Sequence, residues 1–291
     1  MTNKLRQYFP MIHTRQEVLA EIEAKPKLKQ EFYSWEKKYR KEFLDFCTGV
    51  KGVKIMYDFI SKEILNPETV PERVEELLSL LIGQQVHIKE VLPNDGTRIS
   101  DESTLVIMDM VVELEDGSIV NLEVQKIGYK FPGARSVCYS ADLLLRQYKK
   151  VRSKKGKKFN YTDVKDVYTI VLFEKSPTEF HEFPDTYIHY FEQHSNTGIQ
   201  LNLLQKYLFI SIDIFLKYQQ NIGIQLETRR DAWLAFMGSD DPDIILKVIE
   251  KYPGSEEARL AMRDLKSIYV DLNRIDEFAA LANAMPGHIR F

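Results

Sequence analysis

Residues 106–125 read VIMDMVVELEDGSIVNLEVQ, and their alternation of apolar and polar side chains is the main indication of the fold. Side chains along a β-strand point to opposite faces of the sheet with a period of two. This rule divides residues 120–125 into an apolar face and a polar face, and the polar face carries Asn121, Glu123 and Gln125. We therefore expect a strand here, with one face in the core and one polar face.

A single acid interrupts the apolar run before this strand. Residues 105–112 are almost continuously apolar, as in a strand buried on both faces, but Asp109 stands in the middle of the run. Asp is depleted in strands, and its carboxylate is costly to bury without a partner. We therefore expect another group to pair with Asp109.

The connection EDG at residues 115–117 allows two strand registers. A three-residue loop with Gly117 in the left-handed conformation places Asp109 directly opposite Glu123. A two-residue Asp-Gly turn instead pairs Asp109 with Val124 and puts the two acids on opposite faces. The loop type therefore decides whether the acids meet.

In the first register, the Cβ atoms of Asp109 and Glu123 lie about 5 Å apart on one face. Like charges at this spacing repel, and a cation between them relieves the repulsion. Oxygen ligands suit Mg²⁺, which binds one or two protein carboxylates together with water and substrate phosphate. This register therefore predicts a magnesium site.

The order of acid, turn, Glu-x-Gln strand and helix resembles the PD-(D/E)XK nuclease superfamily. Within it, the chain is most similar to the PD-(D/E)XK nuclease family transposases, which are related to recombination-promoting nucleases and replace the motif lysine by glutamine, as LEVQ does here. The resemblance extends from YDF at residues 57–59 through MDMVVELEDGSIVNLEVQ and ARSVCYSADLLLRQY to DAWLAFM near Trp233. It implies an α/β fold with a restriction-endonuclease-like core, in which helices flank a mixed central β-sheet, and with helical N- and C-terminal additions.

The resemblance also implies an activity, that of a Mg²⁺-dependent DNA endonuclease linked to transposition or recombination, with Mn²⁺ able to substitute. Asp109 and Glu123 would bind the metal, and the Val124 carbonyl would add a backbone ligand. Gln125 stands where the superfamily usually has a catalytic lysine. Glutamine can orient a water molecule, but it brings no charge and cannot act as a base at neutral pH.

An upstream acid often completes such sites from an early helix. Asp58 matches the start of the family pattern loosely, and Glu63 is its rival. Periodicity alone favours a solvated helix-face position for either residue.

Basic and polar side chains follow in a helix that we expect over residues 134–148. The resemblance implies that some of them line the active-site edge near phosphate, among Arg135, Tyr139, Arg146 and Gln147, and a solvated helix face is an equally weighted alternative. The run KKVRSKKGKK at residues 149–158 then predicts salt-sensitive attraction to the DNA backbone. Its candidate contacts are Lys149, Lys150, Arg152, Lys154, Lys155, Lys157 and Lys158.

Periodicity assigns elements to the rest of the chain. Residues 1–49 read as a helical arm with a capping box at Thr14 and Glu17, and residues 28–47 form an amphipathic segment whose aromatic stripe is predicted to be core. The nuclease-like domain is expected over 50–238, and a C-terminal helical extension over 239–291. Further helices are expected at residues 71–85 and 227–237, and strands at 86–92, 164–173 and, at the sheet edge, 187–191. The apolar stretch 203–215 is compatible with helix or strand.

Composition bounds the function. With 291 residues and 44% hydrophobic content, the chain can bury a sizeable core, and its net charge of −3 means that any DNA-binding surface must be local. Two cysteines without a CxxC pattern fit a reducing cytoplasm and no zinc site. The sequence shows no signal peptide, membrane span or nucleotide-binding motif, so we expect a cytoplasmic protein whose partner is DNA, without a nucleotide cofactor, and we leave a homodimer open.

Two other functions compete with the nuclease. Because of Gln125, the chain could be a DNA-binding or scaffold protein that keeps the fold with weak or no cleavage. An unrelated α/β enzyme acting on a small molecule would require a closed apolar pocket and no DNA affinity, and it ranks last.

Overall fold

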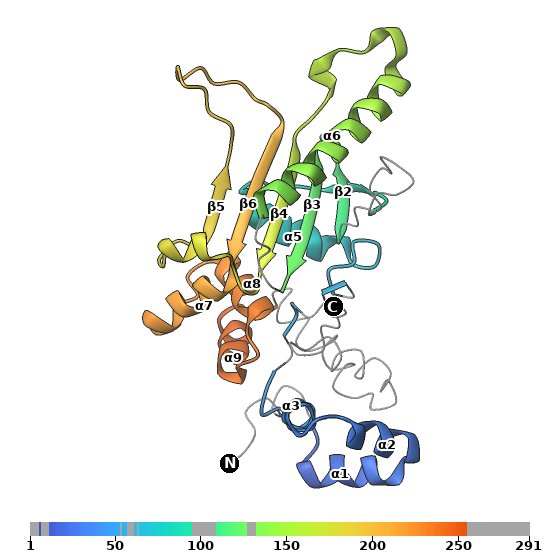
Figure 1. Ribbon diagram of the computed structural model, residues 1–291, viewed down its shortest axis with the longest axis vertical. Helices are drawn as coiled ribbons and strands as arrows, with labels where there is room; N and C mark the ends of the chain where they lie inside the picture. Colours follow the sequence, from blue (N-terminus) through green and yellow to red (C-terminus); the bar gives the residue numbers. More distant parts are fainter. Residues whose placement is uncertain are drawn as a thin grey trace. The chain divides into compact units, whose positions relative to one another are not determined.

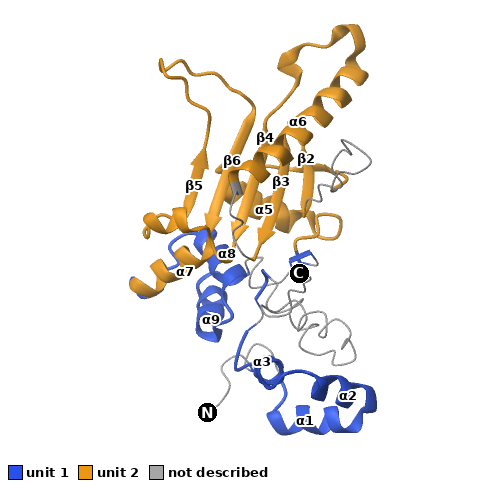
Figure 2. Cartoon of the chain, in the orientation of Figure 1, with its two compact units in different colours: residues 1–64, 222–291 blue, residues 65–221 orange. Residues whose placement is uncertain are grey.

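The computed structural model describes residues 6, 12–52, 54–56, 61–62, 64–94, 109–126 and 132–254. The chain divides into two compact units, one of residues 1–64 and 222–291 and one of residues 65–221 (Figure 2). The sheet-bearing second unit is shorter than the expected 50–238 domain. The difference arises because both ends of the expected domain belong to the first unit. There, Gly52 donates a backbone hydrogen bond to Asp240 (2.7 Å), and Met56 donates one to Met237 (3.3 Å).

The second unit is built on a six-stranded mixed sheet with the order β1-β2-β3-β4-β6-β5 (Figure 1). Its strands are β1 (Ile88–Val91), β2 (Met110–Leu114), β3 (Ile119–Gln125), β4 (Val167–Phe173), β5 (Ile188–Phe191) and β6 (Gln205–Ser211). β3, β4 and β6 are parallel, whereas β1, β2 and β5 join by antiparallel pairing. The central place of β4 and the edge place of β5 confirm two sequence predictions.

The described residues of this unit form the helices α5 (Pro71–Ile82), α6 (Pro132–Lys155) and α7 (Ile212–Asn221). In Figure 1, α6 lies in front of the sheet and α5 behind it. Short 3₁₀ turns span Gly156–Lys158, Tyr161–Asp163 and Thr178–Glu182. The stretch 203–215, for which the sequence allowed helix or strand, contains first a strand and then a helix, since β6 runs directly into α7.

α6 covers the sheet face that the sequence predicted to be polar. Tyr139 and Leu143 of α6 pack into one apolar cluster with Val111, Ile119 and Val167, whose side chains share the face of Glu123. Both faces of β2 and β3 are therefore buried. The polar side chains of β3 are enclosed because the crossover from β3 to the parallel strand β4 runs over them as a helix.

The first unit contains α1 (Arg15–Ala24), α2 (Pro26–Ser34), α3 (Lys37–Cys47), α8 (Arg229–Gly238) and α9 (Pro242–Lys251). The capping box predicted at the start of α1 is present, with Thr14 and Glu17 bonding each other's backbone N–H groups. Asp241 caps α9 by accepting from the Asp243 N–H (2.9 Å). No helix in the described ranges is both long enough and apolar enough to cross a membrane.

The amphipathic segment expected over residues 28–47 is not one helix. It breaks at Trp35 and Glu36, whose ψ angles of 151° and 150° are extended. The break lets aromatic rings of two helices meet, since the centroids of Phe32 and Phe43 lie 5.9 Å apart and those of Trp35 and Phe43 lie 5.4 Å apart. The stripe is largely core, as predicted, because Phe32, Tyr39, Phe43 and Phe46 are buried.

Candidate active site

The loop between β2 and β3 is the three-residue loop. The Leu114 N–H donates to the Ser118 carbonyl (2.8 Å), and Gly117 has a φ of 89°, in the left-handed region. The Asp116 carboxylate accepts from the Ser118 N–H (2.8 Å) and from its hydroxyl (3.0 Å), which stabilises the turn. The two-residue alternative is therefore wrong.

This loop places the two acids opposite each other. Met110 pairs with Leu122 and Val111 with Asn121, so the next residue out, Asp109, faces Glu123. Residues 105–108, which we also expected in this strand, lie outside the described residues.

Backbone hydrogen bonds join the two acids. Asp109 Oδ2 accepts from the Val124 N–H at 2.8 Å, and Glu123 Oε1 accepts from the Asp109 N–H at 3.2 Å. Each carboxylate is thus held by the backbone of the opposite chain segment. The register and these two bonds together fix both carboxylates at one end of the β2–β3 pair.

The environment of Glu123 opposes its ionisation. Burial raises its pKa, the negative charge of Asp109 adds to the rise, and the result is a pKa of about 7. The Asp109 N–H, the Asn121 amide and the positive charge of Arg135 act in the opposite direction but do not cancel it. Glu123 is 3% exposed, so water screens the repulsion poorly.

Gln125 follows on the same strand face as Glu123 and is buried. Its Oε1 atom has no hydrogen-bond partner among the described residues. A buried amide oxygen without a partner costs free energy, so this position favours a ligand that offers it a positive charge or a hydrogen-bond donor. A metal ion or a water molecule meets that description.

Asn121 is a site residue that the sequence analysis did not select. It is fully buried two residues before Glu123, and Thr169, also fully buried, stands beside it on β4. The Asn121 side chain and the Thr169 hydroxyl form no hydrogen bond of standard geometry with the described residues. The period of two already placed Asn121 on the face of Glu123, whereas only the β3–β4 pairing reveals Thr169.

The candidates on α6 separate into two groups. Arg135, in the first turns, lies close enough to Glu123 to lower its pKa, and its guanidinium is 5.0 Å from the centroid of the Tyr139 ring. Tyr139 itself belongs to the core.

The second group, Gln147 and Arg146, lies further along α6. Gln147 is 3% exposed and donates a hydrogen bond to the Gly117 carbonyl (2.9 Å), so its side chain holds the hairpin loop. Arg146 is bound to Asp142 and the Pro93 carbonyl.

These contacts correct the expectation that Tyr139 and Gln147 line the active-site edge. Both side chains are buried and face the core or the hairpin, because the helix turns them toward the sheet. Of the four, Arg135 is the one that the structure brings to the acids.

The basic run is not a separate loop, because α6 continues through it to Lys155. Lys150 lies fifteen residues after Arg135, which is about 22 Å along a helix axis at about 1.5 Å per residue. The run therefore begins at the opposite end of α6 from the acids. The sequence had not indicated this separation, because it is set by the length of α6.

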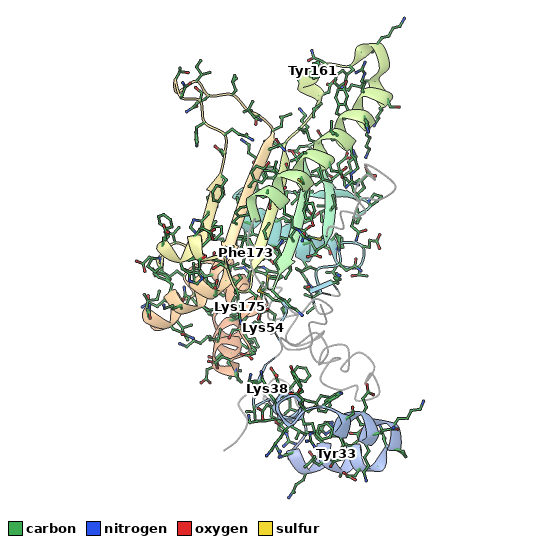
Figure 3. The ribbon with its side chains drawn as sticks, in the orientation of Figure 1. Tyr33, Lys38, Lys54, Tyr161, Phe173 and Lys175 are labelled. Carbon is green, nitrogen blue, oxygen red and sulfur yellow. The ribbon has the colours of Figure 1, made fainter. Side chains whose placement is uncertain are left out.

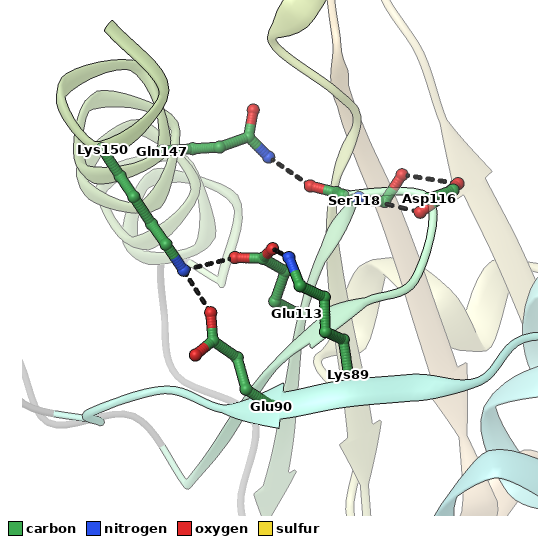
Figure 4. Close-up of polar contacts among 8 residues, drawn as sticks. Lys89, Glu90, Glu113, Asp116, Ser118, Gln147 and Lys150 are labelled. Atoms are coloured by element: carbon green, nitrogen blue, oxygen red, sulfur yellow. Dashed lines mark hydrogen bonds and ion pairs between the residues drawn. The ribbon is translucent and has the colours of Figure 1, made fainter. Parts of the chain in front are cut away.

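Part of the basic run is engaged in ion pairs at that end (Figure 4). Lys150 contacts Glu113 (2.7 Å) and Glu90, and Lys89 also contacts Glu113. Burial acts to raise the pKa of Glu113, but the bonds from the two lysines outweigh it and lower the pKa. This cluster ties α6 to β1 and β2, so Lys150 has a structural partner.

The remaining basic side chains differ in their surroundings. Lys155 pairs with Asp163, and Arg152 donates to the Tyr148 hydroxyl. Four others are exposed and pair with no acid among the described residues: Lys149, Lys154, Lys157 and Lys158. These four are the cations of the run that are available to a partner.

The two upstream acids, Asp58 and Glu63, lie outside the described residues. Within the described ranges, no group of three or more His, Cys, Asp or Glu side chains is arranged to hold a metal ion. Among the described residues, the acids at the site are the pair Asp109 and Glu123.

Comparison with known proteins agrees with the fold. A model of the PD-(D/E)XK nuclease family transposases matches residues 55–273, which include all six strands. No curated protein and no solved structure matches the chain. Since the match covers more than half of the 291 residues, the chain belongs to the PD-(D/E)XK nuclease family transposases, a family of nucleases with a role related to transposition.

Proposed function

We propose that the protein is a Mg²⁺-dependent DNA endonuclease that hydrolyses phosphodiester bonds during transposition or recombination. This proposal is carried by the pairing of Asp109 with Glu123 across the hairpin, in which burial of Glu123 and the negative charge of Asp109 together raise the pKa of Glu123 to about 7. A divalent cation removes that repulsion, because it stabilises the ionised form of both groups.

The residues present fit magnesium. Two carboxylates and the partnerless Oε1 of Gln125 are hard oxygen donors, and Mg²⁺ completes its coordination with water and substrate phosphate. Asp109 and Glu123 would hold the ion, and the Val124 carbonyl is the proposed backbone ligand. When bound, the ion would lower the pKa of a water molecule and neutralise charge on the scissile phosphate. Mn²⁺ has the same ligand preference and would substitute.

The chain's own residues would position the reactants. Gln125 would orient the attacking water through its buried amide, and Arg135 would bind the phosphate through two parallel N–H groups. Neither residue takes the proton of the water, since an amide and a guanidinium are not bases at neutral pH.

DNA would also contact the far end of α6. Lys149, Lys154, Lys157 and Lys158 offer salt-sensitive attraction to phosphates about 20 Å or more from Arg135, which is roughly six base pairs at about 3.4 Å per step. A duplex bound along α6 would reach both ends of the helix. The basic end would then hold the DNA, while the acidic end acts on it.

Nicking of supercoiled plasmid by the purified protein tests the proposal. We expect nicking with Mg²⁺ or Mn²⁺, none with EDTA, and loss of nicking in Asp109→Ala and Glu123→Ala. Glu115→Ala is the matched control, since this exposed acid lies on the same hairpin away from the site and should leave nicking unchanged. Nicking that persists in both site variants would refute the assignment.

Gln125 supports a second candidate, a DNA-binding scaffold that retains the nuclease fold. The two candidates separate in a Gln125→Lys variant, which restores the residue usual in the superfamily. A site that is otherwise assembled should gain activity from the added charge. A scaffold should bind DNA at low salt and stay inactive with either residue.

A further inference from the structure

The end of α6 carries an exposed aromatic side chain that packing does not explain. Tyr161 is 73% exposed, more than any other large apolar or aromatic side chain in the described part of the chain. It stands at the outer end of the second unit, beyond the last turn of α6 (Figure 3). Exposed aromatic rings of this kind are enriched where proteins bind partners.

The Tyr161 ring has a defined orientation. It stacks on the Tyr148 ring, with centroids 6.2 Å apart and planes 13° apart, and the Phe159 ring meets it edge-on at 5.3 Å. Asn160 and Asp163 close a capping box around the turn, through the bonds Thr162 N–H to Asn160 Oδ1 (3.1 Å) and Asn160 N–H to Asp163 Oδ2 (2.8 Å). A ring held in this way loses little conformational entropy when a ligand covers it.

The charge around the ring matches a polyanion. Lys154, Lys157 and Lys158 are exposed within seven residues of Tyr161, and none pairs with an acid among the described residues. The one acid of the turn, Asp163, is neutralised by Lys155. The ring therefore lies in a locally positive surface of a chain whose net charge is −3.

A parallel aromatic stack that ends in an open ring, next to lysines, fits a nucleic-acid base. Bases stack on aromatic side chains while the backbone follows basic groups, and this recognition requires a base that is not paired inside a duplex. We propose that Tyr161 is the outer layer of a base-stacking platform, with Tyr148 beneath it and Phe159 at its edge, and that it binds an unpaired base of DNA.

This inference rests on the proposed function, since it takes DNA to be the substrate, and it specifies the kind of DNA. Tyr148 lies thirteen residues after Arg135, or about 20 Å along the helix, so the unpaired base would be roughly six nucleotides from the scissile phosphate. The preferred substrate would then contain a single-stranded segment at that distance.

Binding of two labelled oligonucleotides in EDTA tests the platform without cleavage. One is a duplex with a short single-stranded gap, and the other is fully paired. Fluorescence anisotropy should show that Tyr161→Ala weakens binding of the gapped DNA by about tenfold, within the range of about 5- to 150-fold for loss of one stacked base, and leaves the paired duplex within about twofold. Tyr161→Phe, which keeps the ring, should bind like the wild type.

Lys154→Ala is the matched control, because it removes a charge from the same surface and should weaken both oligonucleotides alike. An independent readout is photocrosslinking of 5-iodouracil placed in the gap, which we expect to label Tyr161 and not Tyr139. The platform is refuted if Tyr161→Ala binds both DNAs like the wild type, if the substitution weakens binding of both DNAs equally, or if the wild type binds neither.

Failure of the platform and failure of the nuclease are distinguishable. Metal-dependent plasmid nicking with no effect of Tyr161→Ala on gapped DNA would retain the nuclease and reject the platform. Ring-dependent binding of gapped DNA by a protein that nicks nothing would retain the platform and support the scaffold.

Discussion

Replacing Glu123 by Gln should stabilise the metal-free protein, and the gain should depend on pH. The difference between the ordinary Glu pKa of 4.5 and the value of about 7 in the folded protein corresponds to about 3 kcal/mol. The folded state binds the proton more tightly than the unfolded state. The free energy of unfolding therefore falls as the pH rises from 4.5 toward 7, and it levels off above that pH.

The assay is urea unfolding in EDTA, followed by far-UV circular dichroism, for the wild type and Glu123→Gln at several pH values. We expect the two proteins to be equally stable at about pH 4.5 and the variant to be more stable by about 3 kcal/mol at about pH 8. The reason is that glutamine keeps the size and the acceptor oxygen of glutamate but cannot ionise. Comparison of the two proteins cancels the titration of the groups that they share.

The second half of this experiment repeats the unfolding measurements with Mg²⁺ at about pH 8. Metal should stabilise the wild type by RT ln(1 + [Mg²⁺]/Kd), which is about 2.7 kcal/mol at about 100 times Kd, and should stabilise the variant much less. A stability difference between the two proteins that does not change with pH would refute the claim that the Asp109 charge and burial raise the Glu123 pKa. Equal stabilisation of both by Mg²⁺ would refute Glu123 as a ligand.

Three further predictions concern the hairpin and the basic end of α6. Gln147→Ala should lower the free energy of unfolding, measured with urea, by about 2 kcal/mol. The reason is that it removes the hydrogen bond to the Gly117 carbonyl and the one from the Lys165 N–H. If the role of Gln147 is structural, the substitution should leave DNA affinity unchanged. Gly117→Ala should cost about 1–2 kcal/mol in the same assay, because φ is 89° and the added Cβ would lie 3.3 Å from Lys165 Cγ; an unchanged stability would argue against the left-handed loop. Lys157→Ala and Lys158→Ala should each reduce the slope of log Kd against log salt by about one, and a slope equal to that of the wild type would remove these lysines from the DNA contact.

The ends of α6 have different roles in this arrangement. The acids and Arg135 lie near its start, whereas the exposed lysines and Tyr161 lie at its end. A single helix therefore sets the distance between the proposed cleavage position and the proposed DNA-binding surface. Variants at the far end should change binding without changing the chemistry at the acids.

Much of the site could be predicted from local sequence. The period of two and a lone acid in an apolar run predicted that Asp109 and Glu123 share a face if residues 115–117 form a three-residue loop, and the observed register is the one that this loop gives. These features are local, because a hairpin's register depends on its loop and on the strand residues beside it. The family match agrees with the resemblance carried by the same residues.

Other expectations were wrong because they depended on distant contacts. Tyr139 and Gln147 have side chains suited to binding phosphate, yet packing against the sheet and a bond to the hairpin bury them. The break at Trp35 also has no local breaker residue, and it accompanies aromatic packing between two helices. Residue propensity and hydrophobic periodicity do not predict such contacts between elements.

The local sequence pattern predicted the two hairpin strands and the candidate acids Asp109 and Glu123, because these depend on residues that are neighbours along the chain, but it left the loop type, and with it the strand register, open. Only the tertiary structure decided that α6 covers the acidic face, that Glu123 is buried enough for its pKa to reach about 7, and that the basic run lies at the far end of the helix. Burial and separation in space arise from packing between elements, and the physical reason for the division is that a pKa responds to every charge and every low-dielectric neighbour, however far apart they are in sequence.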